Sequence, residues 1–315
     1  MTQASRPTVL PADATGITRA AMLLREGGRV AVPTETVYGL AARADRDESV
    51  AAIYHAKGRP SFNPLIVHVS DLAAAERLAV FDARARQLAA AFWPGPLTLV
   101  LPLRAEAGLA AAVTAGLATV ALRCPAHPVM RAVLAQAELP LAAPSANRSG
   151  GVSPTCSDHV AHSLGAAVDL ILDGGACEAG LESTIVAVRE SGWQVLRPGP
   201  ITREAITVVL GTVDSDGTRN AGIEAPGQLE SHYAPGKPVR LNAMTAEAGE
   251  FLIGFGAIAG DASLSVAGDL TEAASRLYAV LHQAAASPHP RIAVAPIRGE
   301  GIGLAINDRL RRAAA

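Results

Sequence analysis

Two short polar motifs carry residue types that could bind a phosphorylated substrate. Lys57 and Arg59 flank a glycine at the end of a predicted helix. Such a pair can clamp a polyphosphate, because lysine acts as a point charge and arginine as a bidentate donor. Ser145 and Asn147 lie two residues apart on a predicted loop. On an extended backbone their side chains point the same way and could bind an amide, carboxylate or phosphate. Taken alone, the first motif is also typical of a helix C-terminus and the second of an ordinary turn.

Further polar groups lie at the ends of predicted strands. The segment 33–40, with sequence PTETVYGL, directly follows a strand and offers hydroxyls, a carboxylate and a phenol. His68 lies in an otherwise apolar strand, Arg123 just after another, and Arg197 beside a Pro-Gly pair. Open α/β sheets bind their ligands outside the strand ends. We therefore expect these groups to converge in one pocket.

The elements that would position these groups form an α/β pattern. In residues 1–210, short β-rich runs alternate with alanine-rich helical stretches such as 15–27 and 128–137. Residues 211–237 are rich in Gly, Asp, Ser, Asn and Pro and predict a linker. Residues 238–315 predict a smaller α/β unit, which has a thin core unless it docks on a partner. Its predicted strands are 239–241, 251–255 and 291–295, and its predicted helices are 246–250, 270–286 and 304–312.

Composition excludes several other classes. The 315 residues are 50% hydrophobic and 18% charged, so a largely disordered chain is excluded. The net charge of -2 leaves no global basic field for nucleic acid. Three scattered cysteines form no disulfide framework, which favours a reducing compartment, and we expect a cytoplasmic protein. No run of about 20 apolar residues is present, so no membrane span is expected.

Metal and nucleotide motifs are weak. His159 and His162 have helical spacing but no third ligand nearby, so we predict histidines on a helix surface and no protein-held metal site. No Walker motif is present.

Six segments together are identified as those of a known family. They read PTETVYGLAARA, YHAKGRPSFNPLIVHV, FWPGPLTLVLP, APSANRSG, LESTIVAV and VLRPGPI. In this order they resemble the Sua5/YciO/YrdC family. The tail after APGQLESHYAPGKPV is similar to that of the long, two-domain Sua5 form. The resemblance covers nearly the whole chain.

The resemblance implies a fold and a reaction. The fold would be an open, twisted, mixed α/β sheet with a positively charged cavity in residues 1–210. Residues 211–237 would form a linker that acts as a lid, and 238–315 a smaller Rossmann-like α/β domain. The enzyme would be a nucleotidyltransferase that makes threonylcarbamoyl-AMP and pyrophosphate from L-threonine, bicarbonate and ATP. A separate transferase complex would use this product to form N6-threonylcarbamoyladenosine at position 37 of tRNA.

The resemblance also assigns roles to single residues. The catalytic motifs would be Lys57 and Arg59 together with Ser145 and Asn147. Mg²⁺ would accompany ATP, held mainly by the nucleotide rather than by the protein. ATP would contact Arg59, Asn63, Thr119, Asn147, Ser153, Arg197 and Tyr233. Threonine would contact Thr36, His68, Arg123 and Ser183. A phosphate contact from the linker stretch 228–231 is not expected, because it lacks the basic residues that the family often has there.

Other functions compete with this one. The same fold could accept double-stranded RNA or tRNA on a concave basic surface, although the acidic pI and the scarcity of aromatic residues argue against that as the main role. Weak RNA binding beside the catalytic role is compatible with the sequence. Carbamoyl-adenylate chemistry on another acceptor would require acylphosphatase and zinc-finger segments, which are not visible. A catalytically inactive scaffold is disfavoured because both paired motifs are intact.

Overall fold

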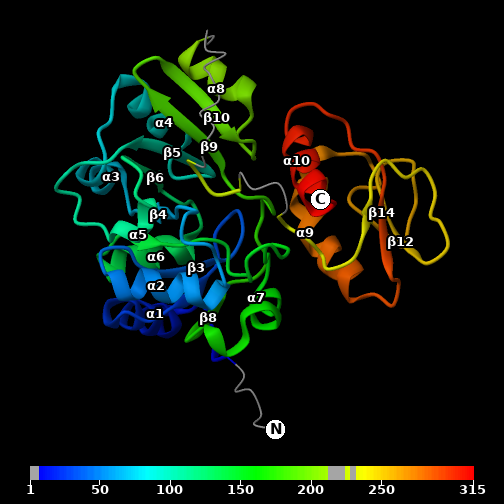
Figure 1. Cartoon of the computed structure of the whole chain (residues 1–315), viewed down its shortest axis with the longest axis horizontal. Helices are drawn as coiled ribbons and strands as arrows, with labels where there is room; N and C mark the ends of the chain where they lie inside the picture. Colours follow the sequence, from blue (N-terminus) through cyan, green and yellow to red (C-terminus); the bar gives the residue numbers. More distant parts are fainter. Residues whose placement is uncertain (1–6, 212–223, 228–231) are drawn as a thin grey trace.

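A long mixed sheet organises the first part of the chain (Figure 1). The computed structural model describes residues 7–211, 224–227 and 232–315. Within these ranges the strands of this sheet are, in chain order, β1 (Val9–Pro11), β2 (Val30–Val32), β3 (Gly39–Arg43), β4 (Ile66–His68), β5 (Leu97–Pro102), β6 (Thr119–Arg123), β7 (Leu141–Ala142), β8 (Leu170–Asp173), β9 (Thr184–Arg189) and β10 (Gly192–Arg197). Their spatial order is β1-β8-β2-β3-β7-β4-β6-β5-β9-β10. The sheet contains parallel pairs, such as β4 with β6, and antiparallel pairs, such as β5 with β6, so it is mixed, as predicted.

Helices connect these strands. They are α1 (Ala14–Glu26), α2 (Asp47–Lys57), α3 (Leu72–Leu78), α4 (Ala83–Phe92), α5 (Ala111–Thr114), α6 (Pro128–Ala137), α7 (Ser157–Leu164), the 3₁₀ turn η1 (Gly165–Ala167) and α8 (Arg203–Leu210). Local sequence sets several of their starts. The side chains of Asp13, Asp71 and Asp82 each accept a hydrogen bond from a backbone N–H in the first turn of the helix that follows. The predicted helix at 128–137 is confirmed, with proline at its first position.

Strand alternation divides the core between the two faces of the sheet. Leu40 of β3 packs in a cluster with α2 and α4, whereas Ala41 packs in a separate cluster with α1 and α6. Successive side chains of a strand point to opposite faces, so one strand supplies both clusters. Over β4, β6, β5 and β9 the helices α3 and α4 cover one face only. The other face carries a small cluster that includes Ala225 of the linker, and next to it lie the predicted site residues.

A second, smaller domain follows the linker. Its strands are β11 (Val239–Arg240), β12 (Glu250–Gly254), β13 (Ala262–Ser263) and β14 (Arg291–Val294), and its helices are α9 (Leu270–Ala286) and α10 (Gly303–Ala313). All strand pairs are parallel, in the order β11-β14-β12-β13. The predicted helix at 270–286 is confirmed, because its apolar side chains recur every three or four residues on one buried face.

The predicted helix at 246–250 is wrong. Residues 246–249 form a loop and turn, and Glu250 begins β12 opposite Arg291. The Glu250 carboxylate accepts hydrogen bonds from Arg240 at 2.9 and 2.6 Å. Pairing with a strand and with a distant arginine therefore overrides the local helical propensity of this alanine- and glutamate-rich stretch.

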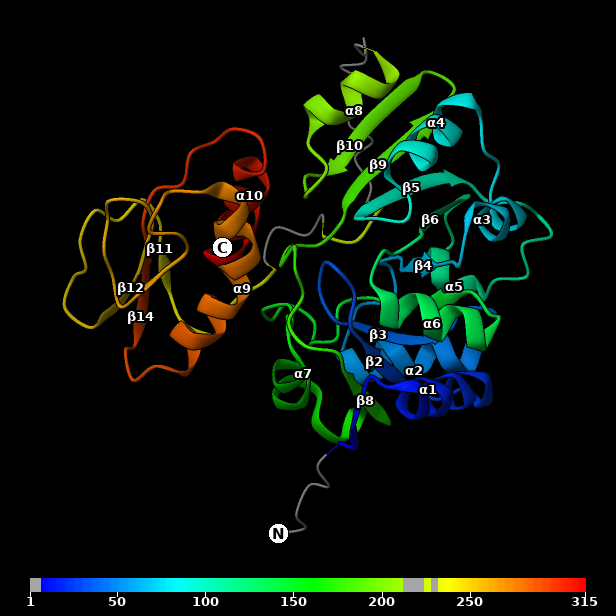
Figure 2. The same cartoon turned by 180° about the vertical axis from the view of Figure 1, so that it is seen from behind.

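The two domains meet through helices. In Figures 1 and 2, α9 and α10 lie between the small sheet and the larger domain. The prediction that His159 and His162 are both surface histidines is wrong for His159. Its ring stacks on that of His282 of α9 with the centroids 3.8 Å apart, whereas His162 is exposed. His282 Nε2 also lies 3.1 Å from the carbonyl oxygen of Ser153. Among the described residues, no helix is both long and apolar enough to cross a bilayer.

Candidate functional site

A narrow polar cleft lies where the uncovered face of the large sheet meets the linker. Its volume is about 50 Å³. It is lined by Thr36, Val37, Arg59, Ile66, His68, Arg123, Ala143, Pro144, Ser145, Glu182, Ser183, Arg197, Pro226, Gly227, His232 and Tyr233. Three arginines face one glutamate in this set, so the described lining has an excess of positive charge. An anionic ligand is the complementary partner for such a lining.

Strand register places His68 beside Arg123. In the parallel pair of β4 and β6, His68 lies opposite Arg123 and Ile66 lies opposite Ala121. The residues between them, Val67 and Leu122, point to the helix-covered core. Residue alternation therefore turns the histidine and the arginine to the same face, at the ends of their strands. Burial, together with the positive charge of Arg123, lowers the pKa of His68 to about 3, so the ring is neutral at neutral pH.

Arg123 is anchored by the loop that follows β2. Its guanidinium donates to Glu35 Oε1 at 2.5 Å and to Thr36 Oγ1 at 2.8 Å. Glu35 Oε2 accepts from the backbone N–H groups of Ala126 and His127, just before α6. Burial raises the pKa of Glu35, but the charge and hydrogen bond of Arg123 outweigh it and the pKa lies below its usual value. Glu35 thus fixes the arginine at the wall of the cleft.

The side chains of Lys57 and Arg59 point in different directions. Helix α2 ends at Gly58, whose φ of 58° lies in the left-handed region that favours glycine. Arg59 enters the cleft wall, where Nε and Nη2 donate to the carbonyl oxygens of Asn63 and Pro64 at 3.2 and 2.9 Å. Burial lowers the pKa of Arg59 to about 10, and it stays protonated at neutral pH.

Lys57 lies behind the cleft, not in its lining. Its Nζ donates to the carbonyl oxygens of Ser145 and Asn147. Burial, followed by the positive charge of Arg59, lowers the pKa of Lys57 well below its usual value. Lys57 therefore holds the loop that carries Ser145 and Asn147 in place, and Ser145 of this loop lines the cleft.

Two buried amide oxygens near this loop lack a partner among the described residues. Asn147 Nδ2 donates to the carbonyl oxygens of Arg148 and Gly151, both at 2.8 Å, but its Oδ1 accepts no hydrogen bond. Asn63 Oδ1 and His68 Nδ1 are likewise buried and unpaired. Buried acceptors are normally satisfied. These three atoms are therefore candidates to accept hydrogen bonds from a bound ligand.

Arg197 closes the other side of the cleft. Its guanidinium donates to the carbonyl oxygen of Ser183 at 3.1 and 2.9 Å and to its Oγ at 3.2 Å. Gly227 of the linker packs on this arginine, and a Cβ at Gly227 would lie 2.9 Å from Arg197 Cδ. Only glycine permits this approach together with its φ of 84°.

His232 and Tyr233 bring the end of the linker into the cleft. Tyr233 is 1% exposed and His232 is 7% exposed. The segment is held at both ends, because His232 N donates to the carbonyl oxygen of Arg312 and Ala234 N to that of Gly150. Burial lowers the pKa of His232 to about 3.

Comparison with known proteins decides the family. Residues 22–199 match the model Sua5_yciO_yrdC, described as "Telomere recombination". The chain belongs to the Sua5/YciO/YrdC family. Residues 201–315 match a second model, described as "Threonylcarbamoyl-AMP synthase, C-terminal domain". The chain is therefore of the two-domain Sua5 type, as the sequence predicts, although the predicted boundaries at 210 and 238 stay predictions.

Relatives cover most of this Sua5-family chain. The threonylcarbamoyl-AMP synthase of Pyrococcus abyssi is 38% identical and matches 93% of this chain and 92% of its own length. The protein of the same name from Bacillus subtilis is 47% identical over 71% of this chain and 66% of its own length. A solved structure described as P. abyssi Sua5 complexed with L-threonine has a TM-score of 0.88, 35% identity and coverage of 98% of this chain and 97% of that one.

The Sua5 cleft gathers most of the site residues that the sequence predicts. It is lined by Thr36, Arg59, His68, Arg123, Ser145, Ser183, Arg197 and Tyr233. The other predicted residues lie outside the lining: Lys57, Asn63, Thr119, Asn147 and Ser153. Thr119 lies at the far end of β6 from Arg123, where it pairs with Pro102. Ser153 Oγ donates to Glu182 Oε1 at 2.6 Å. Residues 212–223 and 228–231 of the predicted linker lie outside the described residues, and so does the stretch 228–231 from which no phosphate contact is expected.

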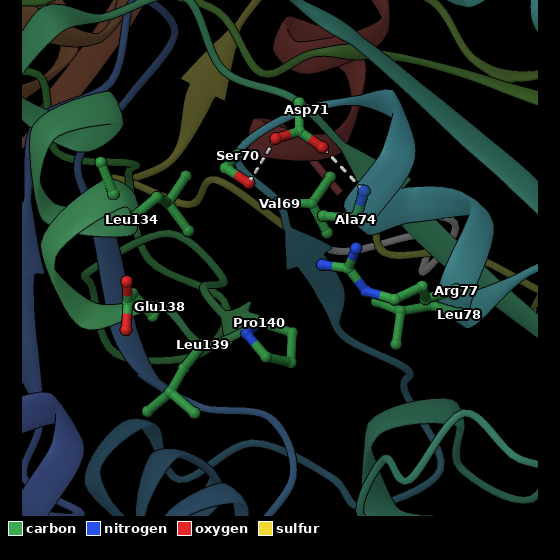
Figure 3. Close-up of a pocket in the computed structure, with 11 residues that line it drawn as sticks. Val69, Ser70, Asp71, Ala74, Arg77, Leu78, Leu134, Glu138, Leu139 and Pro140 are labelled. Atoms are coloured by element: carbon green, nitrogen blue, oxygen red, sulfur yellow. Dashed lines mark hydrogen bonds between the residues drawn. The ribbon is translucent and has the colours of Figure 1, made fainter.

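Larger hollows elsewhere lack this chemistry. A cavity of about 420 Å³ lies between α3 and α6, and none of the predicted site residues lines it (Figure 3). Its Asp71 is engaged with Ser70 and with the backbone N–H of Ala74 at the start of α3. A further hollow of about 710 Å³ lies between α7 and α9 and is lined by histidines from both. The candidate site is therefore identified by its residues and not by the volume of the cavity.

Proposed function

We propose that this protein is a threonylcarbamoyl-AMP synthase, joining L-threonine, bicarbonate and ATP to give threonylcarbamoyl-AMP, pyrophosphate and water. One observation carries the proposal: a single cleft combines Arg59 and Arg197 with the Arg123, His68 and Thr36 group. The names of the relatives that match nearly the whole chain support it.

ATP would bind at the end of the cleft between Arg59 and Arg197. Both guanidiniums are buried and are oriented by backbone carbonyl acceptors. Partly desolvated, preorganised cations are suited to the charge that grows on a departing pyrophosphate. Ser145 would donate to the same anion. Lys57 would act through the loop carbonyls it holds, and Asn63, Asn147, Thr119, Ser153 and Tyr233 would surround the rest of the nucleotide.

Threonine would bind at the other end, where the bound L-threonine of the P. abyssi protein supports a matching site. Arg123, fixed by Glu35, would take the threonine carboxylate, with Thr36 and Ser183 beside it. His68 is neutral, and its unpaired Nδ1 would accept a hydrogen bond from the amine. The free amine would attack bicarbonate or carbon dioxide to give a carbamate. A carbamate oxygen would then attack the α-phosphorus as pyrophosphate leaves.

The protein's part in these steps is to position reactants and stabilise charge, which can lower barriers by about 7–11 kcal/mol through positioning alone. Glu35 and Glu182, the carboxylates at or beside the cleft, are already engaged with Arg123 and Arg309. Among the described residues no group of three metal-ligating side chains forms a cage. We therefore propose that Mg²⁺ enters with ATP, ligated by phosphates and water.

The linker would act as a lid. At about 50 Å³ the cleft has room for a few water molecules but is too small for a nucleotide. His232 and Tyr233 would therefore withdraw as ATP enters and close over it, which would protect the carbamate from water. The product would pass in the cytoplasm to a separate transferase that modifies tRNA.

The test is direct. Pure protein with ATP, bicarbonate, threonine and Mg²⁺ should give threonine-dependent pyrophosphate release and an adenylate of the expected mass by mass spectrometry. Omitting threonine or bicarbonate should abolish both signals. Absence of the adenylate, combined with RNA binding that weakens steeply with salt, would instead favour a nucleic-acid-binding module.

A further inference from the structure

One buried carboxylate in the cleft is held by the second domain. Glu182 lies two residues before β9 and lines the cleft beside Ser183. Its Oε2 accepts from Tyr278 Oη of α9 at 2.8 Å and from Arg309 Nε of α10 at 2.9 Å. Its Oε1 accepts from Ser153 Oγ. Two of its three partners thus come from the other domain, more than ninety residues away in the chain.

Arg309 is held in place for its contact with Glu182 by several neighbours. It is completely buried, and its Nη1 donates to Asp308 at 2.8 Å. Its guanidinium carbon lies 5.4 Å from the centre of the Tyr233 ring, a cation–π contact. The ring of Tyr233 in turn stacks on that of Tyr278, with the centroids 5.6 Å apart. The second domain therefore presents the Arg309 charge and the Tyr278 ring to Glu182 and to Tyr233 of the linker.

A carboxylate at this place would oppose nucleotide binding if it were left alone. Glu182 shares the cleft with Arg59 and Arg197, the two cations suited to a triphosphate. A free carboxylate repels phosphate groups at short range, and it would also pair with the nearest arginine. The bonds from Arg309 and Tyr278 hold its Oε2 on the side of the second domain and neutralise its charge.

We propose that Arg309 and Tyr278 are positioning residues for nucleotide binding, which hold and neutralise Glu182 so that Arg197 stays available to the triphosphate. The inference rests on the proposed function. It assigns the second domain a defined task, because the cleft binds ATP only when α9 and α10 are docked. By linkage, ATP should also favour docking.

A charge-compensation experiment tests this. Arg309→Met should raise the KM for ATP at least tenfold, with less than a threefold change in the KM for threonine, because the uncompensated Glu182 faces the phosphates. Adding Glu182→Gln to Arg309→Met should recover most of the ATP affinity. Arg309→Lys, which keeps the charge, should recover part of it. Arg276→Met on α9 breaks an exposed pair with Glu272 and should leave both KM values unchanged. Calorimetric titration with ATP gives the same comparison without turnover.

The failures can be told apart. An inactive wild-type protein overturns the proposed function, and calorimetric titration with ATP still tests the positioning role of Arg309 and Tyr278. An active protein whose Arg309→Met variant keeps its KM for ATP overturns the inference. A double variant no better than Arg309→Met also overturns it, since that result indicates general structural damage. If Arg309→Met does not fold, Tyr278→Phe replaces it. A threefold or larger rise in the KM for ATP that Glu182→Gln reverses supports the positioning role of Arg309 and Tyr278, and no rise in the KM refutes it.

Discussion

Glu182→Gln offers a quantitative check on the contact that joins the two domains. Burial would raise the pKa of Glu182, but the charges of Arg309 and Arg197, with the hydrogen bonds of Ser153 and Arg309, lower it from 4.5 to about 2. A carboxyl with a lowered pKa in the folded state stabilises the fold above its unfolded pKa and loses that contribution as pH falls. The window therefore runs from about pH 4.5 down to about pH 2.

The size of the effect follows from the shift. At about 1.36 kcal/mol per pKa unit, the displacement from 4.5 to about 2 corresponds to about 3 kcal/mol of stability at neutral pH. At pH 7 the glutamine variant should be less stable than wild type by about 3–5 kcal/mol, because the buried Arg309 loses one of its two carboxylate partners and keeps only Asp308. As pH falls, wild type loses the titration energy and the variant does not, so the difference should shrink by about 2 kcal/mol by pH 3.

Urea unfolding followed by circular dichroism at pH 7, 5, 4 and 3 measures this difference. Other carboxyl groups titrate in both proteins and cancel in the comparison. Glu300→Gln, which removes an exposed ion pair with Arg298 at 3.7 Å, serves as the control and should stay within about 0.5 kcal/mol of wild type. A constant difference between wild type and Glu182→Gln from pH 7 to pH 3 would show that Glu182 does not have the lowered pKa, and would refute the reasoning.

Two further substitutions probe the site by other routes. Lys57→Met removes the hydrogen-bond donor to the carbonyl groups of Ser145 and Asn147, so urea unfolding should show a loss of stability of about 2–4 kcal/mol, and adenylate formation should be lost. The control Lys237→Met removes two similar bonds at a half-buried position and should cost less stability and keep activity; equal effects of the two variants would contradict the role of Lys57 in holding the loop. Gly199→Ala would place a Cβ 2.5 Å from the backbone nitrogen of Thr184, so thermal melting should show a loss of about 1–3 kcal/mol, whereas Gly299→Ala meets open space; equal melting temperatures for the two variants would rule out the clash.

Local signals in the sequence sufficed for much of the fold. Proline at the first position and apolar spacing predicted α6, and a long amphipathic pattern predicted α9, because both helices depend mainly on neighbours three or four residues away. The predicted helix at 246–250 was wrong for the opposite reason. The conformation of this stretch is decided by pairing with β14 and with Arg240, and both partners lie outside the predicted helix. The short strand β3 was missed, because its sequence shows no alternation of apolar and polar residues.

Polar residue types at the ends of predicted helices and strands predicted Arg59, His68, Arg123, Ser145 and Arg197 as a group, and the structure brings all of them to one cleft. Their roles toward ATP and threonine stay predictions. The sequence did not show that Lys57 turns away from the cleft to hold a loop, because the left-handed turn at Gly58 sends the two cations in different directions.

The sequence by itself determined the chemical inventory, the order of the elements and the family. Only the tertiary structure decided which groups neutralise one another. Glu35 meets Arg123 across 88 residues, and Glu182 meets Arg309 across 127. Electrostatic energy depends on distance and burial in space, and neither can be read from separation along the chain.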